Sequence, residues 1–361
     1  MAEQYIVNSA DLTAVADSIR SASGKAEQLA FPAEFVDKIE RIRTVEETLN
    51  ADGYLTSVVL HGYKTIRTQM FYKVDTLLNV SGLEGITSIG NYAFYGCTNL
   101  ALTSLPEGLT SIGGSAFENC TKLAFTSLPE SLTSIGESAF LRCTKLALTS
   151  LPEGLTSIGR WTFQQCTTLT FISLPNSITS IELNAFYSCT NLALTSLPGN
   201  LTSIGSNAFT YCPKLALTSL PEGLTSIGVG AFFGCSSLAL TSLPEGLTSI
   251  EKSAFYGCTN LALTSLPEGL TSIATYAFYN CTSLALTSLP EGLTSIGDKA
   301  FYNCTGLTTI TFQGTPTSIS SSAFSGCTNL TTINVPWAED AVANAPWGAT
   351  NATINYNYAG G

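Results

Sequence analysis

Hydrophobic and polar positions recur along this chain with a fixed period of 23 residues. Phenylalanine stands three places before a cysteine and leucine three places after it in nearly every copy, as in Phe255, Cys258 and Leu261. All eleven cysteines lie on this series: Cys97, Cys120, Cys143, Cys166, Cys189, Cys212, Cys235, Cys258, Cys281, Cys304 and Cys327. A short repeat buries its apolar face only against its neighbours, so the pattern predicts stacked rungs in one continuous solenoid.

Each copy predicts a few short elements joined by turns. A strand begins at the leucine after the cysteine and ends at proline, and Pro-Glu-Gly then supplies a turn with proline at its second position. Leu-Thr-Ser-Ile makes a second extended piece, and Ala-Phe makes a tight helical turn. The predicted fold class is a β-rich leucine-rich-repeat solenoid with a short α-helical N-terminal segment and a C-terminal cap.

The first predicted strand has an irregular pattern. Strands of such repeats read Leu-x-x-Leu-x-Leu, and the copy with Leu307, Ile310 and Phe312 agrees. Most other copies place the middle leucine one position earlier, which turns it outward unless a bulge intervenes. The pattern favours a bulge, and the alternative is an exposed apolar stripe that would mark a contact face. The leucines concerned are Leu102, Leu148, Leu194, Leu217, Leu240, Leu263 and Leu286.

The pattern divides the chain into four segments. Residues 1–50 are predicted to form a helical attachment segment with helices over 11–20 and 33–43, where apolar residues recur at helical spacing. Residues 51–80 are a degenerate N-capping repeat, and residues 81–336 are the repeat array. Residues 337–361 form a C-terminal cap, with a short helical stretch over 339–344 and with Trp337 and Trp347 covering the last rung.

The cysteine column predicts buried, reduced thiols. Stacked strands bring neighbouring cysteines within disulfide range, but equivalent thiols have no preferred partner and eleven cannot all pair. Buried thiols pack as small apolar groups. A metal–thiolate site needs clustered cysteines such as CxxC, and none occurs.

Composition narrows the function. A net charge of −11 argues against nucleic acid as a partner. No run of 18 apolar residues exists, so membrane insertion is not predicted, and the start of the chain lacks the pattern of a secretory signal. No nucleotide-binding glycine motif occurs, no cofactor is predicted, and the single histidine, His61, has no nucleophile or carboxylate pair marked out beside it. The sequence therefore predicts a protein that is not an enzyme.

A column of glutamates leaves one chemical alternative open. Asn176 and Gly199 divide it into two acidic ladders, which we interpret as a solvated edge, with calcium binding as the alternative. A glycosidase working through these carboxylates is a third class of function. The column consists of Glu107, Glu130, Glu153, Glu222, Glu245, Glu268 and Glu291.

Variation between otherwise similar copies marks a candidate binding edge. Positions six, five and two places before the cysteine carry aromatic and charged residues in some copies and small polar residues in others. Tyr, Trp and Arg dominate binding hot spots. Drift at exposed loops is the alternative, and a repeating polymer bound to the uniform Thr-Ser surface is the rival within the binding class. The candidate residues are Tyr92, Tyr95, Arg160, Trp161, Tyr256, Tyr276, Tyr279, Lys299 and Tyr302.

The rung Leu-Thr-Ser-Ile-Gly-x-x-Ala-Phe-Tyr-Gly-Cys-Thr-Asn-Leu resembles the BspA-like leucine-rich repeats of bacterial surface and secreted proteins, over residues 63–336. Residues 8–12 and 31–36 resemble the N-terminal stretch of tail-associated proteins from phages and prophages of Gram-positive gut bacteria. Residues 335–337 and 345–348 resemble a tail end found in the same group. The Leu-Ala-Leu-Thr-Ser-Leu strand departs from the family pattern and puts its usual concave binding surface in doubt.

The resemblance implies a non-enzymatic adhesion or receptor-binding protein. Its partner would be a protein or a cell-surface glycan receptor, and residues 1–48 would join a larger assembly. The corresponding locations are a phage or prophage tail or, as the alternative, the bacterial cell surface, where the chain would act as an adhesin that mediates host or bacterial contact.

Overall fold

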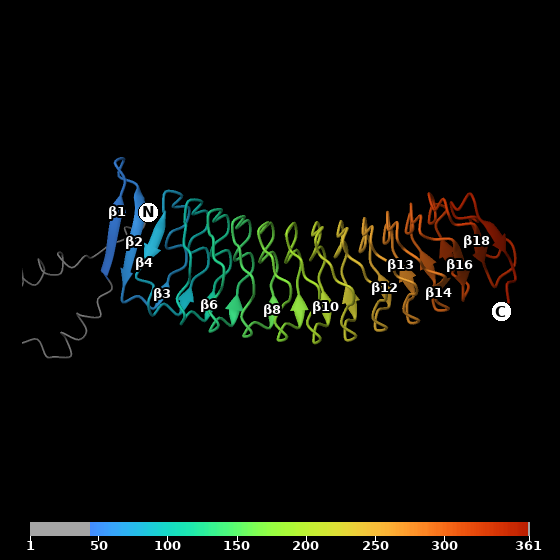
Figure 1. Ribbon diagram of the computed structural model, residues 1–361, viewed down its shortest axis with the longest axis horizontal. Helices are drawn as coiled ribbons and strands as arrows, with labels where there is room; N and C mark the ends of the chain where they lie inside the picture. Colours follow the sequence, from blue (N-terminus) through green and yellow to red (C-terminus); the bar gives the residue numbers. More distant parts are fainter. Residues whose placement is uncertain (1–43, 360–361) are drawn as a thin grey trace, which may run out of the picture.

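The computed structural model describes residues 44–359 as an elongated stack of rungs (Figure 1). The helices expected over 11–20 and 33–43 lie outside the described residues. Residues 44–359 contain strands and turns but no helix. The solenoid of leucine-rich rungs is therefore confirmed, whereas an α-helical contribution finds no support in the described part of the chain.

A β-hairpin forms the N-terminal end of the stack. Strand β1 (Thr44–Leu49) pairs antiparallel with β2 (Leu55–His61), and β4 (Asn79–Ser81) joins β2 in parallel. Val58 and Leu60 of β2 are fully buried against the first rung. Residues 44–49, at the end of the segment predicted to be helical, are thus a strand.

The Ser-Ile pieces form a ladder of short parallel strands along one side. Each strand pairs in register with the strand one repeat away, with isoleucine turned inward and serine on the outer side. Three sheets of four strands result: β3-β5-β6-β7, β8 to β11, and β12-β13-β15-β17. The strands are β3 (Thr65–Ile66), β5 (Ser88–Ile89), β6 (Ser111–Ile112), β7 (Ser134–Ile135), β8 (Ser157–Ile158), β9 (Ser180–Ile181), β10 (Ser203–Ile204), β11 (Ser226–Ile227), β12 (Ser249–Ile250), β13 (Ser272–Ile273), β15 (Ser295–Ile296) and β17 (Ser318–Ile319).

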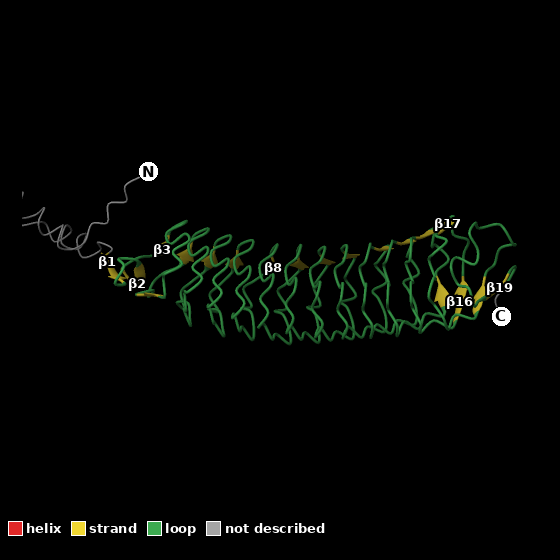
Figure 2. Cartoon of the chain, turned by 90° about the horizontal axis from the view of Figure 1, so that it is seen from above, coloured by secondary structure: helices red, strands yellow, loops and turns green. Residues whose placement is uncertain are grey.

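The strand predicted after each cysteine is wrong for most rungs. Among the rungs that contain a cysteine, only the last three have a strand there, and β14 (Ser288–Leu289), β16 (Thr309–Phe312) and β18 (Thr332–Asn334) form a parallel sheet with β19 (Thr353–Asn355) of the cap. At the other end, β4 holds the same position in the degenerate rung and pairs with β2. Figure 2 shows loop in the corresponding place of the central rungs. β16 and β18 belong to the copies with the regular Leu-x-x-Leu-x-Leu pattern.

The early leucines of the irregular copies are all buried, so the exposed stripe is also wrong. Leu148 and Leu194, for example, expose nothing to solvent. Their backbone is not a regular strand, so strict alternation between two faces does not apply to it. The leucines point inward, as the bulge interpretation required, without a β-bulge in a strand ladder.

The turns follow the prediction in part. The Ala-Phe segment is a tight turn, in which the Cys120 N–H donates to the Phe117 carbonyl at 3.0 Å. In the Pro-Glu-Gly segment the Leu109 N–H donates to the Pro106 carbonyl at 3.0 Å. Proline is therefore the first residue of this turn, not the second.

Stacked phenylalanines form the centre of the core. From Phe71 to Phe324 the ring centroids of successive rungs lie 5.1–5.7 Å apart. All eleven cysteines are free and buried beside them. Each thiol donates to the phenylalanine carbonyl of the preceding rung, as Cys212 Sγ does to Phe186 O at 3.1 Å. The cysteines thus also link neighbouring rungs through hydrogen bonds.

Two tryptophans close the core at the C-terminal end. Trp347 is fully buried, its Nε1–H donates to the Ala343 carbonyl at 2.8 Å, and Trp337 packs edge-on against it. The helix predicted over residues 339–344 is wrong, because this segment forms turns. Asp340 and Asn344 have φ values of 66° and 72°, which a right-handed helix cannot include.

Candidate functional site

The backbone of each Ala-Phe turn contains left-handed positions. The residue five places before the cysteine has positive φ in nearly every rung, and in three successive rungs it is Asn or Gly, the types that tolerate this conformation best. Three others of these rungs have serine there, and four carry a large side chain, at a cost of about 1–2 kcal/mol each. These large residues are Tyr92 (φ 55°), Trp161 (φ 53°), Tyr276 (φ 59°) and Lys299 (φ 50°).

Four rings two places before the cysteine stack on one another near the C-terminal end. The ring centroids of Phe233, Tyr256, Tyr279 and Tyr302 follow at 4.3, 4.5 and 4.6 Å, with interplanar angles of 3°, 2° and 10°. We call these four residues the aromatic ladder. Within the ladder each ring face is covered by the next ring. A partner would therefore meet mainly ring edges and phenol hydroxyls.

Further side chains border the aromatic ladder. Tyr276 meets Tyr279 edge-on at 5.7 Å, and Lys299 Nζ lies 6.0 Å from the ring centroids of both Tyr276 and Tyr302. The pKa of the Tyr256 phenol lies above its usual value, mainly because the phenol is partly removed from solvent and secondly because Tyr279 lies beside it. This hydroxyl is therefore uncharged at neutral pH, and the nearby positive charge is that of Lys299.

A smaller aromatic cluster lies near the N-terminal end. Tyr72 stacks on Tyr95 at 5.0 Å, Tyr92 packs against both rings, and Lys73 Nζ lies 5.3 Å from the Tyr72 centroid. Seven repeats separate Tyr95 from Tyr256. At about 4.8 Å per rung the two aromatic groups are about 34 Å apart, so only a large partner could contact both.

Arg160 and Trp161 stand between the two aromatic groups. Arg160 Nε lies 3.5 Å from Glu182 Oε2, and both side chains are well exposed, at 57% and 45%. Trp161 is half-buried, and within residues 44–359 its indole stacks on no other aromatic ring. This pair forms a third, separate location on the solenoid.

The nine candidate residues thus fall into three groups. Tyr256, Tyr276, Tyr279, Lys299 and Tyr302 come together at the aromatic ladder, and Tyr92 and Tyr95 belong to the N-terminal cluster. The candidate set omits Tyr72, which lies in the degenerate rung, and Tyr211, which is 47% exposed and packs edge-on against Phe233. The period places Tyr72 in the column of Tyr95 and Tyr211 one position after that column. That any of these residues binds a partner stays a prediction.

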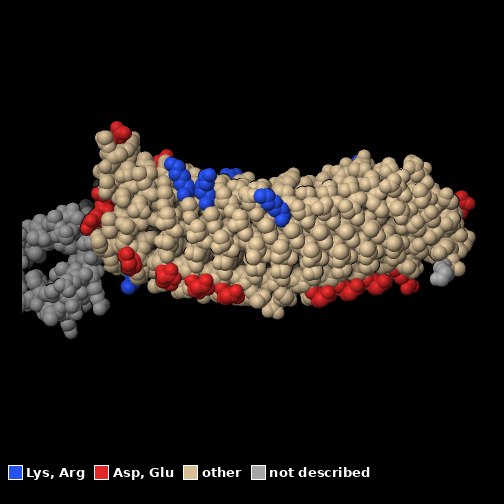
Figure 3. Space-filling view, in the orientation of Figure 1, with Lys and Arg blue, Asp and Glu red and all other residues tan. Residues whose placement is uncertain are grey.

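The predicted acidic edge is visible as two rows of acidic side chains along one long edge (Figure 3). The seven glutamates are exposed, and the Glu245 carboxylate accepts a bond from the Glu268 N–H at 3.2 Å. Across residues 44–359, no three His, Cys, Asp or Glu side chains are grouped so that they could hold a metal ion.

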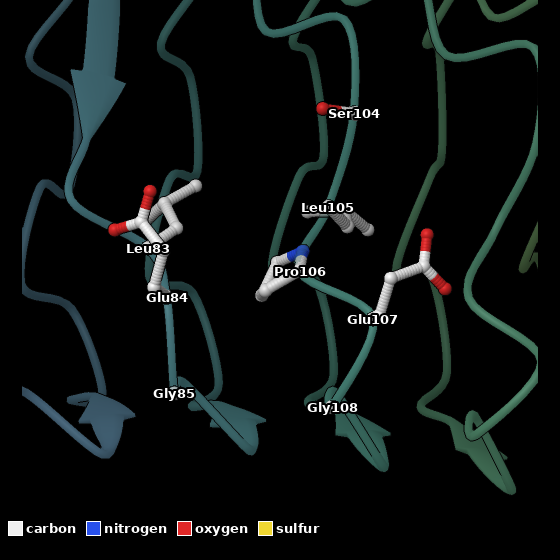
Figure 4. Close-up of a pocket in the computed structure, with 8 residues that line it drawn as sticks. All are labelled: Leu83, Glu84, Gly85, Ser104, Leu105, Pro106, Glu107 and Gly108. Atoms are coloured by element: carbon white, nitrogen blue, oxygen red, sulfur yellow. The ribbon is translucent and has the colours of Figure 1, made fainter.

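A hollow of about 410 Å³ lies beside the first two turns of this edge. The carboxylates of Glu84 and Glu107 lie on opposite sides of it and do not point toward one another (Figure 4). Glycoside cleavage needs two carboxyl groups facing one bond. His61 lies elsewhere, on β2, with its Nε2 3.1 Å from the exposed Glu46 carboxylate.

Comparison with known proteins places these features in a family context. The family model of the BspA type leucine-rich repeat region matches this chain in six copies, over residues 64–193, 144–262 and 225–344. A leucine-rich repeat protein from Bacteroides ovatus is 25% identical over 83% of each chain, with a TM-score of 0.62. No curated protein matches.

Two further solved structures are similar in sequence but superpose less well. A leucine-rich cell surface protein from Faecalibacterium prausnitzii is 25% identical over 82% of this chain and 94% of that one, with a TM-score of 0.44. A leucine-rich repeat protein from T. pallidum is 31% identical over 58% of this chain and 90% of that one, with a TM-score of 0.38.

Residues 44–359 include no helix with the length and apolar character that a membrane span requires.

Proposed function

Because the chain belongs to the BspA type leucine-rich repeat family, whose solenoid is a typical scaffold for non-enzymatic binding, we propose that it is a receptor-binding or adhesion protein. The observation that supports this best is the aromatic ladder with Tyr276 and Lys299 beside it. The ladder is the contact surface, and the partner is a protein on a cell surface. A cell-surface glycan is the alternative receptor.

Three properties of the ladder and of Tyr276 and Lys299 beside it suit a protein partner. Its rings hold one another in place, so that binding orders few side chains. Its hydroxyls and ring edges offer hydrogen bonds together with apolar contact, as tyrosine does in binding sites. Tyr276 and Lys299 keep large side chains on left-handed backbone, where Asn or Gly would fold more favourably.

The proposed setting is a phage or prophage tail, with residues 1–48 joining the chain to a larger assembly. The resemblance of residues 8–36 and 335–348 to tail-associated proteins supports it, and the second of these stretches contains both cap tryptophans. The alternative is a bacterial cell-surface adhesin. The two settings differ in the cells that the chain should bind.

Cell binding by the fluorescently labelled full chain tests the proposal. The variant Tyr276→Asn/Tyr279→Ser/Tyr302→Ser uses residue types that other rungs have at these positions, as in Asn184 and Ser325. We expect at least a tenfold loss of binding in flow cytometry. Binding to host epithelial cells and not to bacteria supports the adhesin, whereas binding to Gram-positive gut bacteria supports the tail or an adhesin that mediates bacterial contact.

The matched control changes the uniform surface. Thr195→Lys/Thr218→Lys alters two exposed threonines away from the ladder and should leave binding unchanged. If binding survives the ladder variant but is lost in this control, the receptor contacts the Thr-Ser surface and the proposed site is wrong.

A further inference from the structure

Neighbouring rungs of the array are normally joined by backbone hydrogen bonds on three sides. These sides are the Ser-Ile strands, the Ala-Phe turns and the leucine segment after the cysteine. The boundary between β6 and β7 shows all three. Its bonds include Gly136 N–H to Ile112 O at 2.8 Å, Phe117 N–H to Ala139 O at 2.8 Å and Ala147 N–H to Phe125 O at 3.0 Å.

The next boundary, between β7 and β8, has backbone bonds on the Ala-Phe side alone. There the Ser138, Phe140 and Arg142 N–H groups donate to the following rung at 2.9, 3.0 and 2.8 Å. Among the described residues, no backbone bond joins β7 to β8 or residues 146–149 to residues 169–172. The backbones of these two rungs are therefore connected along one side and free along the other two.

The Ser-Ile side of this boundary stands further open than the same side elsewhere. A Cβ at Gly159 would lie no closer than 3.9 Å to the backbone of the preceding rung, whereas a Cβ at Gly136 would lie 2.4 Å from the Gly114 nitrogen. Ile135 of β7 is half-buried, whereas the isoleucines of the other Ser-Ile strands are buried. The missing hydrogen bonds thus accompany a real separation of the two rungs.

The Ala-Phe side of the same boundary is closed. The Phe140 and Phe163 rings stack at 5.7 Å with an interplanar angle of 2°, and Cys166 Sγ donates to Phe140 O at 3.0 Å. Beside them, the Thr168 hydroxyl donates to Leu146 O at 2.6 Å. The two rungs can therefore tilt about this side without separating the stacked core.

Three residues after the boundary depart from the repeat. Thr162 is buried where every other cysteine-containing rung has alanine, and its hydroxyl donates to Gly159 O at 3.0 Å. A buried place sized for alanine accepts a larger side chain only if its surroundings move apart. Thr170 and Ile172 stand where most rungs have alanine and threonine, in the leucine segment that lacks its backbone bonds.

The second interruption of the Ser-Ile ladder, between β11 and β12, is different. There the Ala262 N–H donates to Leu240 O at 3.1 Å and the Phe232 N–H donates to Ala254 O at 2.9 Å. Ile227 also stays buried. This boundary is joined on two sides, so that a tilt about one of them would break the bonds of the other.

We propose that the boundary between β7 and β8 is a hinge at which the solenoid bends, and that Thr162, Thr170 and Ile172 create it. The N-terminal hairpin lies on one side of the hinge and the aromatic ladder on the other. Bending about the Ala-Phe side changes the direction in which the ladder faces relative to the hairpin. The hinge does not depend on the binding function proposed for the ladder.

Distances between pairs of spin labels on the full chain, measured by pulsed electron paramagnetic resonance, test the hinge. The labels are attached to an unnatural amino acid, because the chain has eleven cysteines of its own. The pair at Ser104 and Ser196 crosses the hinge, and the control pair at Ser173 and Ser265 crosses the boundary between β11 and β12. All four serines are exposed, and each pair spans four rungs, about 19 Å. We expect the distance distribution across the hinge to be at least twice as wide as that of the control pair.

A variant with regular residues at the hinge tests its cause. Thr162→Ala/Thr170→Ala/Ile172→Thr introduces the residue types that the next rung has at these positions, so the variant should fold. We expect the distribution across the hinge to narrow to that of the control pair, and the amides of Thr156 and Gly159 to exchange more slowly with solvent. Equal widths for the two pairs in the wild type, or an unchanged width across the hinge in the variant, would overturn the inference.

Discussion

Cysteine occupies its column for two physical reasons that act together. Its side chain is small and apolar enough to fill the space beside the stacked phenylalanines, and its thiol donates to a carbonyl of the preceding rung. That carbonyl, for example Phe186 O, also accepts the N–H of the cysteine in its own rung, Cys189. Alanine would leave a cavity and remove the link between the rungs.

Burial of the thiols makes folding sensitive to alkaline pH. Burial raises the pKa of Cys212 to about 12, whereas an unfolded cysteine titrates near 8.5. Between these values the unfolded chain has lost the proton that the folded chain keeps, so stability present below about pH 8.5 falls as the pH rises. Each such thiol contributes up to about 1.4 kcal/mol per pH unit.

Urea unfolding in reductant between pH 7.5 and 10 measures this loss. We expect a steep fall in the free energy of unfolding, and a shallower fall in Cys212→Ala, which is less stable at neutral pH. A free energy of unfolding that stays constant to pH 10 would show that the thiols are not buried as described.

A second residue-scale prediction concerns the left-handed positions. Lys299 has a φ of 50°, so Lys299→Asn should raise the free energy of unfolding by about 1 kcal/mol. The exposed Lys252, one position earlier in its own rung, does not share this conformation, and Lys252→Asn should change stability by less than about 0.5 kcal/mol. Equal effects of the two changes in urea unfolding would contradict the argument from backbone strain.

At the scale of the elements, the Ser-Ile strands were predictable and the strands after the cysteines were not. Isoleucine at a fixed repeat position needs burial in every rung, and this alone sets the register of that ladder. The leucines after the cysteines are buried as well, but on an irregular backbone. An alternating strand pattern does not predict such a backbone. The period likewise predicted the columns of the candidate site, but it could not show that Tyr256, Tyr279 and Tyr302 stack while Trp161 stands apart.

The Ser-Ile ladder is interrupted between β7 and β8 and between β11 and β12, and the second interruption gives a prediction at the scale of the elements. Thr248 and Glu251 lack the backbone bonds to the preceding rung that Thr271 and Ala274 make at 2.9 Å. Amides at 248–251 should therefore exchange with solvent faster than those at 271–274. Hydrogen exchange resolved by peptide measures this, and equal protection of the two segments would show that the ladder is continuous.

At the scale of the whole molecule, the free energy of unfolding is approximately a sum of contributions from the rungs and from the contacts between neighbouring rungs. Two different structures cover the ends of the stack. The β1–β2 hairpin covers one end of the phenylalanine stack, and Trp337 and Trp347 cover the other. Each rung contacts mainly its two neighbours, so damage in the middle should separate the two halves.

Phe186→Ala tests this coupling. The ring is fully buried near the midpoint of the stack, so its loss should cost about 3–5 kcal/mol and divide one unfolding transition into two. Calorimetry of the variant and of the wild type measures both effects, with exposed Tyr211→Ser as the control that should leave a single transition. A single lowered transition in Phe186→Ala would mean that the array unfolds as one cooperative unit.

The near-identity of the central rungs makes the length of the molecule adjustable. A copy gained or lost by recombination between matching stretches would keep every column in register, because the insertion equals one period. Each such event would move the aromatic ladder about 4.8 Å nearer to or farther from the N-terminal hairpin and leave its own geometry unchanged. One repeat more or less thus changes the distance between the N-terminal hairpin and the aromatic ladder by a fixed step, without any change in the structure of either.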